Sequence, residues 1–202
     1  SSPAATVGSG AAAESAAAKQ PIGVDAWFSS MELSYRAPWP LPLVITRQGI
    51  EQYNRLFRLL LAFKHVHLEL QRLDLPRGNL LAWALRSELS YFVSQVLLYF
   101  QQDVIEAAHA RLLHTVEASA EFNEVLGAHE EFLATLASHC FLKAPELQSA
   151  LMASLRLAIV FSTSVSSGTA ALASSTEMRR LQLEFAGTVR SVLRMMTSMH
   201  RQ

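Results

Sequence analysis

Apolar residues recur with helical periodicity from Ile50 onward, and this pattern predicts the first long helix of the chain. Spacings of three, four and seven residues place them on one face of a helix. Thr46 is a suitable N-cap despite Arg47 in the first turn, and Pro76 and Gly78 predict the end of the helix. The expected apolar face is Ile50, Tyr53, Phe57, Leu60, Leu61 and Leu68, and the expected polar face is Glu51, Arg55, Arg58, His65, Glu69 and Arg72.

A second and longer helix is predicted from Asn79, which can act as its N-cap, to about Thr115. Its length would be roughly 50 Å at about 1.5 Å per residue. That exceeds the usual globular helix, so the pattern indicates either a long bundle helix or a break that the sequence does not reveal. Its apolar stripe is predicted to be Leu81, Leu85, Leu89, Phe92, Val96 and Tyr99.

Three more helices follow, and together they predict the fold class. The third begins after Ser119 and ends near Lys143, and the fourth runs from Pro145 to about Phe161. A Ser-rich loop leads into the fifth helix, which starts at about Glu177. We therefore predict an all-α fold, a bundle of about five long, mostly antiparallel helices. One side of the fifth helix carries Met178, Leu181, Phe185, Val189, Val192, Leu193 and Met196.

The segment before the first helix has a different pattern, "YRAPWPLPLVIT", with three of the seven prolines of the chain. Proline fixes φ and lacks an N–H, so these residues cannot join a central strand or a helix. The segment is predicted to be an extended strap that carries Trp39 along the bundle or against a partner. No P-x-x-P spacing occurs, which disfavours a ligand for SH3 domains. Upstream of it, apolar and polar residues alternate as in a half-buried strand: Trp27, Met31, Leu33 and Tyr35 against Ser30, Glu32 and Ser34.

Composition bounds the class of protein. Half of the 202 residues are apolar and only 17% are charged, with a formal net charge of +0. Zero net charge argues against a dedicated nucleic-acid binder, and a neutral, apolar chain is prone to associate with partners. Residues 1–21 are Ala/Ser/Gly-rich and are expected to form a disordered linker, with a frayed Ala helix as the alternative. The apolar run "LMASLRLAIVF" is interrupted by Arg156 and is expected to be too short to span a bilayer.

The candidate chemistry in the chain does not assemble into an active site. The histidine spacings do not place two metal ligands on one helical face: they are two residues for His65 and His67, and five for His109 and His114. "AHEEFL" begins like a zinc-protease helix, but Leu133 stands where the second histidine must be. Cys140 is the single cysteine and lies among apolar residues, so it is interpreted as a buried core residue. We expect no metal, no cofactor and no enzymatic activity.

The ordered series of motifs resembles a known family. "MELSYRAPWPLPLVIT" followed by "YNRLFRLLLAFKHV" is similar to the C-terminal domain of gamma-tubulin complex proteins, the Spc97/Spc98 family. The resemblance continues through "LRSELSYFVSQVLLYFQQDVIE" and "AHEEFLATLASHCFL" to the last helix. The Trp-Pro pair resembles components four to six more than the two core components. Because family members are several times longer, residues 22–202 are expected to form part of the gamma-tubulin-binding domain.

The resemblance implies a non-catalytic scaffold that binds gamma-tubulin and other gamma-tubulin complex components without nucleic acid or membrane. It implies a place in the cytoplasm and cytoskeleton, at a microtubule-organising centre such as a spindle pole or basal body. Tubulins are acidic, so the basic edge of the first helix is a candidate contact. The residues predicted to bind the partner are Arg55, Arg58, His65, Arg72, Tyr35 and Trp39.

Two other interpretations of these six residues are consistent with the sequence. The basic side chains can equally form a solvated helix face, and the aromatic ones can pack in the core. A generic helical interaction or membrane-tethering subunit is the alternative function, since amphipathic patterns are common to both.

Overall fold

The computed structural model describes residues 31–75, 77–167 and 175–199. The predicted linker 1–21 lies outside the described residues, and so do Trp27 and Ser30 of the predicted strand. The all-α prediction is confirmed, because the described residues form helices and connectors and contain no strand. The helices are the 3₁₀ turn η1 (Leu41–Leu43), α2 (Arg47–Arg72), α3 (Leu80–Leu98), the π-helical η2 (Tyr99–Glu106), α4 (Ala107–Ala118), α5 (Phe122–His139), α6 (Pro145–Ser166) and α7 (Ser175–Met199).

Local signals begin the helices as the sequence predicts. The Thr46 hydroxyl accepts a hydrogen bond from the Gly49 N–H at 3.1 Å. The side-chain oxygen of Asn79, Oδ1, accepts one from the Ala82 N–H at the same distance. Both caps therefore satisfy an N–H that has no partner within its helix. Pro145 occupies the first turn of α6, where its missing N–H costs nothing.

Helix α5 ends earlier than predicted, at His139 instead of near Lys143. Phe141 has a φ of 60°, and the Leu142 N–H donates to the Ala137 carbonyl oxygen at 2.9 Å. This is the hydrogen bond of a Schellman turn, which usually has glycine at the left-handed position. The Phe141 ring is buried and stacks on Tyr99 with the planes at 15°, so packing compensates for the unfavourable backbone conformation.

The second predicted helix is a single rod, formed by α3, η2 and α4. It continues without interruption from Leu80 to Ala118 and contains a π-helical stretch at Tyr99–Glu106. Wide π turns change the phase of a helix. This change of phase keeps Phe100 and Val104 buried on the same side of the rod as the buried residues of α3. The rod is therefore not broken, as the sequence allowed, but changes from α-helix to π-helix and back.

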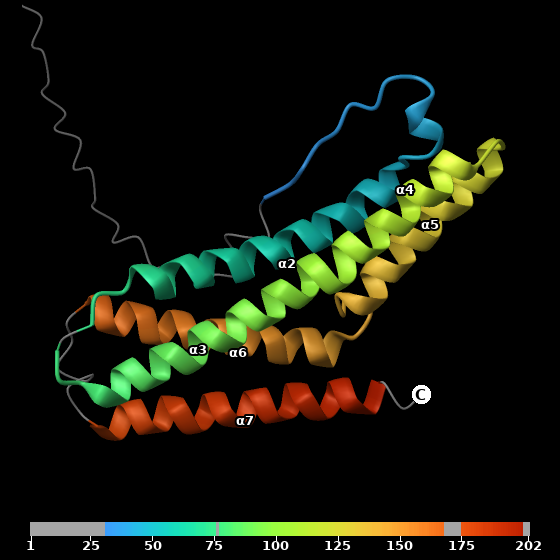
Figure 1. The fold of residues 1–202 in the computed structure, drawn as a ribbon. Coiled ribbons are helices and arrows are strands. Elements are labelled where there is room, and N and C mark those ends of the chain that lie inside the picture. The colour runs from blue at the N-terminus through green and yellow to red at the C-terminus, as the bar shows by residue number, and fades with distance from the viewer. Residues whose placement is uncertain (1–30, 76, 168–174, 200–202) are drawn as a thin grey trace, which may run out of the picture.

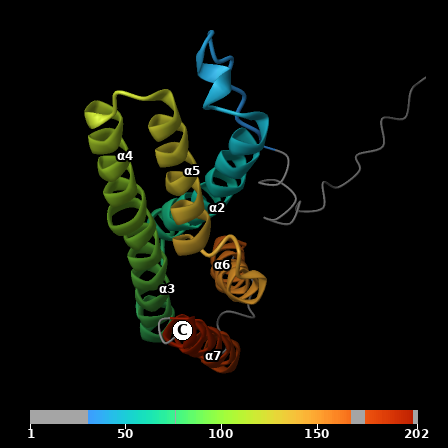
Figure 2. The same cartoon turned by 90° about the vertical axis from the view of Figure 1, so that its right-hand side faces the viewer.

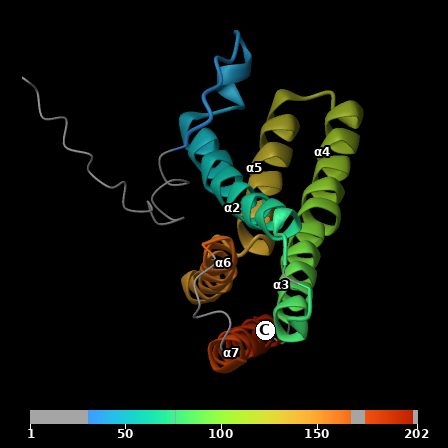
Figure 3. The same ribbon diagram turned by 90° about the vertical axis from the view of Figure 1, so that its left-hand side faces the viewer.

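Neighbouring helices are mostly antiparallel (Figure 1). α2 packs on α3, α4 packs on α5 as a hairpin, and α6 packs on α7. The views in Figures 2 and 3 show the α4–α5 hairpin at one end of the molecule and the α6–α7 pair at the other. α3 and α7 run in the same direction beside each other.

The buried face of α2 differs from the predicted face. The buried side chains include Phe63 and Val66, both fully buried, whereas Leu68 is 36% exposed. Tyr53, Leu60 and Leu61 are partly buried at the edges of this face. Because α2 is apolar on most sides between residues 56 and 63 and contacts α3, α5 and α6, periodicity alone allows more than one choice of face. The core face of α2 consists of Leu56, Leu59, Ala62, Phe63, Val66 and Leu70.

Helix α6 corrects the expectation about membrane length. Its 22 residues make it the one helix, among those described, that is long and apolar enough to cross a membrane. The estimate from the sequence considered only the uninterrupted apolar run and missed the full extent of the helix. Several α6 residues, including Leu151, Leu155 and Phe161, are core residues of this bundle.

Candidate protein-interaction surface

Residues 31–46, here called the strap, lead into α2. Residues 31–38 have no regular secondary structure, and η1 then forms above the start of α2 (Figure 1). Over its described residues, 31–35, the predicted strand is therefore wrong: Leu33 and Tyr35 are exposed, and Met31 is half-buried. An alternating pattern becomes a strand when a neighbouring strand supplies hydrogen bonds, and the described residues contain none.

The side chain of Asn54 takes the place of that neighbouring strand. The Leu33 N–H donates to Asn54 Oδ1 at 2.6 Å, and Asn54 Nδ2 donates to the Leu33 carbonyl oxygen at 3.1 Å. Asn54 is only 2% exposed, so its amide is buried in both bonds. The Asn54 amide thus fixes the strap backbone to α2 about two turns from the start of the helix. Sequence reasoning missed it, although a polar residue so close to the apolar face was a signal.

The prolines shape the strap as a turn more than as an extended segment. The Pro38 and Pro40 carbonyl oxygens accept hydrogen bonds from the Leu41 and Leu43 N–H groups at 2.9 and 3.0 Å, and the Trp39–Pro40 peptide bond is cis. Pro42 lies inside η1, contrary to the expectation that it could not join a helix. The first turn of a helix tolerates proline, because its N–H needs no partner there.

The strap holds its large apolar side chains out toward solvent. Trp39 is 79% exposed and Tyr35 is 54% exposed, so the alternative of core packing does not hold for these two. A row of exposed apolar side chains on a clasped backbone is typical of a protein-binding surface. The row consists of Leu33, Tyr35, Trp39, Leu41 and Leu43.

The predicted basic residues are distributed along α2. Arg58, His65 and Arg72 follow Asn54 at helical spacings that keep them on its side of α2. Arg58 is half-buried, and its Nε donates to the Asn54 carbonyl oxygen at 3.2 Å. Arg72 lies at the far end of the helix, roughly 27 Å from Asn54. The strap therefore lies near Arg58 and far from Arg72.

Arg55 lies at a different junction. Its guanidinium donates to the Leu142 carbonyl oxygen in the Schellman turn at 2.8 Å. It also lines a polar groove of about 330 Å³ between α2 and α5, with Glu130 and Lys143. The structure thus does not unite the six predicted residues in one patch.

A buried polar pair joins α2 to α5 beneath the strap end of the bundle. The Tyr53 hydroxyl and His129 Nε2 are 3.0 Å apart, and His129 is 7% exposed. Burial lowers the pKa of His129 from its ordinary value, an effect that the neighbouring Glu130 partly opposes. Burial raises the pKa of Tyr53. Both groups therefore stay neutral near pH 7 and serve as a hydrogen-bonded contact between helices.

Cys140 is fully buried, and burial raises the pKa of its thiol to about 12. A protonated, inaccessible thiol is a poor nucleophile, which agrees with the interpretation of Cys140 as a core residue. In the described part of the chain, no group of three His, Cys, Asp or Glu residues is placed to hold a metal ion.

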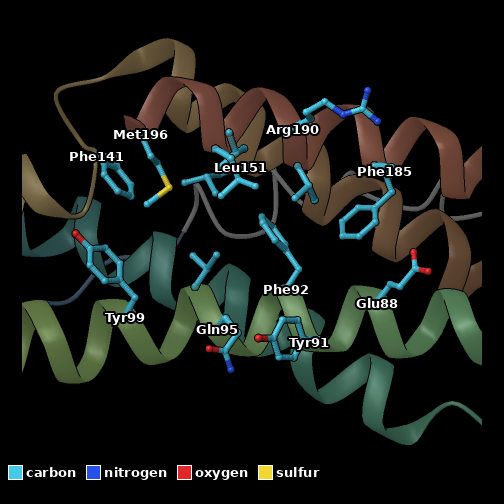
Figure 4. Close-up of a pocket in the computed structure, with 15 residues that line it drawn as sticks. Glu88, Tyr91, Phe92, Gln95, Tyr99, Phe141, Leu151, Phe185, Arg190 and Met196 are labelled. Atoms are coloured by element: carbon cyan, nitrogen blue, oxygen red, sulfur yellow. The ribbon is translucent and has the colours of Figure 1, made fainter. Parts of the chain in front are cut away.

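An apolar groove of about 730 Å³ separates α3 from α7 (Figure 4). Phe92 and Phe185 meet across it edge to face, with ring centroids 5.6 Å apart. Tyr99, Phe141 and Met196 surround one end, and Glu88 lies at the other. The sequence predicts the stripe on each helix but not that the two stripes would line one groove, because the pairing of α3 with α7 depends on tertiary structure.

The assignment to a family rests on nearly the whole chain. Residues 8–202 match the family model described as "Gamma tubulin complex component C-terminal". The chain belongs to the gamma-tubulin complex component family. The match includes the strap and every helix described above, which confirms the resemblance carried by the strap and the helical motifs.

Curated relatives match parts of the same region. Human gamma-tubulin complex component 4 is 31% identical over 125 residues, which cover 57% of this chain and 19% of that protein. The spindle pole body component alp4 of Schizosaccharomyces pombe is 27% identical over 132 residues, covering 57% and 17%. A component 4 homolog of Medicago truncatula is 25% identical over 171 residues, covering 71% and 23%. The chain therefore spans about a fifth of the length of these relatives.

Proposed function

We propose that this chain is part of a non-catalytic scaffold subunit that binds gamma-tubulin and helps to template microtubule nucleation in a gamma-tubulin ring complex. Membership of the gamma-tubulin complex component family supports the proposal. The structural observation that carries it is the strap, whose backbone is clasped by Asn54 while Trp39 stands 79% exposed. Such an arrangement suits the binding of a folded protein.

The mechanism would be one of positioning. A rigid aromatic anchor loses little conformational entropy on binding, so more of the contact energy appears as affinity. Each subunit would hold one gamma-tubulin, and the subunits would lie side by side in the complex. The gamma-tubulins would then already have the relative positions that free subunits must otherwise reach by random collision before a polymer can start. This role requires no active site.

The proposed location is a microtubule-organising centre in the cytoplasm. One matched relative is a spindle pole body component by name. Localisation of the tagged protein beside a spindle-pole marker tests this placement, and a diffuse signal throughout mitosis would contradict it.

The binding test uses the longest reading frame that contains this chain, titrated with purified gamma-tubulin. Combined Tyr35→Ala and Trp39→Ala substitutions should weaken the affinity at least about tenfold, because buried aromatic anchors at interfaces typically contribute about 2 kcal/mol or more. The thermal midpoint should stay unchanged, since both side chains are exposed in the free protein.

Leu113→Ala is the matched control, because Leu113 is 45% exposed and lies away from the strap on α4. It should leave the affinity unchanged. No detectable binding by the wild-type protein at micromolar gamma-tubulin would contradict the proposed function itself. Binding that survives the strap substitutions would contradict only the assignment of the strap as the contact.

A further inference from the structure

Helix α3 carries an apolar stripe on its outer side, away from the strap. The stripe lies opposite the buried face of α3, which includes Leu85 and Leu89. Leu80 is 81% exposed, Tyr91 is 69% exposed and Leu98 is 43% exposed. Figures 1 and 3 show α2 on one side of α3 and α7 on the other, with the outer side of α3 open. An exposed stripe of this kind marks an interaction surface.

The spacing along this stripe is that of a coiled-coil seam. Successive positions are separated by four, three, four, three and four residues, so they follow a 3.5-residue period. The seam therefore stays on one side of α3 over its whole length. It consists of Leu80, Ala84, Ser87, Tyr91, Ser94 and Leu98. Ser94 lies at the α2 edge of the seam, half-buried, with its hydroxyl 3.1 Å from His67 Nδ1, and Tyr91 lies at the α7 edge, where it also lines the groove between α3 and α7.

We propose that the α3 stripe is a self-association surface that binds the α3 stripe of a second copy of this chain in antiparallel orientation. The order of residues in the stripe fits a twofold axis that passes between Ser87 and Tyr91. Leu80 would face Leu98 of the second copy, and Ala84 would face Ser94. Tyr91 would face Ser87, so its ring would meet a small side chain. The small side chains of Ala84, Ser87 and Ser94 allow the two helices to approach closely between the leucine pairs at the ends, and a twofold interface uses the same patch on both copies.

Charges at the two ends of the stripe fit the same arrangement. Arg77 precedes the stripe and Asp103 follows it, and both are exposed. Among the described residues neither has an ion-pair partner. The antiparallel arrangement brings Arg77 of one copy to within about two residues of register with Asp103 of the other. The twofold axis repeats this opposite-charge contact at the other end, whereas a parallel arrangement would place like charges together.

The net charge of +0 removes the long-range repulsion that would oppose self-association. A partner chosen by charge alone would need an excess of one sign along the stripe, and the seam itself contains no charged residue. A second copy is the occupant that supplies the same seam and the complementary ends together. This inference does not depend on the proposed binding of gamma-tubulin.

The test measures the mass of the 202-residue chain by sedimentation equilibrium between about 1 and 100 μM, where small interfaces associate. The wild-type mass should rise from 22.3 kDa toward twice that value. Tyr91→Glu combined with Leu98→Glu should keep the chain monomeric throughout. Leu113→Glu, a matched substitution on α4, should leave the association unchanged. Far-UV circular dichroism confirms that each variant is folded.

A charge exchange tests the orientation. Arg77→Asp alone and Asp103→Arg alone should each weaken association at least about threefold, and the double exchange should restore it. A wild-type chain that stays monomeric at about 100 μM would overturn the proposal and assign the stripe to a different protein. Association that persists in the Tyr91→Glu, Leu98→Glu variant would place the contact elsewhere. Failure of the double exchange to restore association would overturn the antiparallel arrangement.

Discussion

The side-chain amide of Asn54 joins the strap to α2. A polar residue inside a helix is ordinarily solvated, yet the donor and the acceptor of the buried Asn54 amide both pair with Leu33, 21 positions earlier in the sequence. Buried polar groups persist when their hydrogen bonds are satisfied. The two Asn54 hydrogen bonds therefore hold the strap backbone on α2, while its most exposed large apolar side chains, Tyr35 and Trp39, stay in solvent.

Replacing Asn54 should release the strap. In Asn54→Ala the Leu33 N–H loses its partner, and we expect the free energy of unfolding to fall by about 1–3 kcal/mol. Hydrogen exchange at the Leu33 amide should accelerate by more than the global loss of stability explains. Asn123→Ala is the control, because Asn123 is exposed on α5. An unchanged Leu33 exchange rate would show that the clasp is not formed in solution.

The Tyr53–His129 contact predicts a dependence of stability on pH. Burial lowers the pKa of His129 in the folded protein, so the unfolded chain, with a pKa of about 6.5, binds the proton more tightly. This contribution to stability is therefore fully present above about pH 6.5. It is lost as the pH falls through 6.5 toward the folded-state pKa.

Urea unfolding at about pH 7.5 and about pH 5.5 measures this dependence. The wild-type protein should lose more stability between the two values than His129→Asn, in which the titrating group is absent. His139→Asn, a substitution of an exposed histidine in the same helix, should behave like the wild type. If His129→Asn has the same pH dependence as the wild type, His129 is not the group responsible.

At the scale of elements, helix starts were predictable and the face of α7 largely was, since Met178, Leu181, Phe185 and Val192 are buried while Leu193 is exposed. The face of α2 was not predictable. The Thr46 and Asn79 caps and the first turn at Pro145 are local features, so the sequence determines them without knowledge of the fold. The face of α2 depends on which neighbours cover it, and the apolar residues between positions 56 and 63 do not discriminate among the choices. The Schellman turn at Phe141 was missed because glycine is its usual signal.

The face of α2 can be checked by truncation. Phe63 is fully buried and meets Phe100 edge to face, with centroids 5.7 Å apart. Phe63→Ala should lower the free energy of unfolding by about 3–5 kcal/mol, because it removes apolar contacts and leaves a cavity. Leu68→Ala should change it by about 0.5 kcal/mol or less, since Leu68 lies on the exposed side of α2. Equal losses in thermal or urea unfolding would favour the face predicted from periodicity.

For the whole molecule, the lengths of the periodic segments were enough to predict the fold class. The sequence predicted the candidate interaction surface only in part. Trp39 and Tyr35 were identified as contacts, but the sequence equally allowed them to pack in the core. Their exposure depends on where the strap lies relative to α2, which is a tertiary property. The groove between α3 and α7 and the outer stripe of α3 likewise appear only once the helices are placed side by side.

The two proposed surfaces lie on different sides of the bundle. The strap stands above the start of α2, whereas α3 lies between α2 and α7 (Figures 1 and 2). The stripe residues Leu80, Tyr91 and Leu98 are exposed on α3. No described hydrogen bond links a strap residue to α3, and the clasp at Asn54 reaches only α2. Energetic effects of substitutions at separate sites without shared partners generally add. The two surfaces should therefore act independently.

A crossed set of measurements tests this independence. The Tyr35→Ala, Trp39→Ala variant should self-associate like the wild type and lose affinity for gamma-tubulin. The Tyr91→Glu, Leu98→Glu variant should show the reverse, with loss of self-association and unchanged affinity for gamma-tubulin at protein concentrations where the wild type is monomeric. Within each of the two equilibria, the effect of all four substitutions should equal the sum of the effects of the two double variants to within about 0.5 kcal/mol. A larger deviation would mean that the bundle couples its two faces, with α2 as the path, since α2 contacts both the strap and α3.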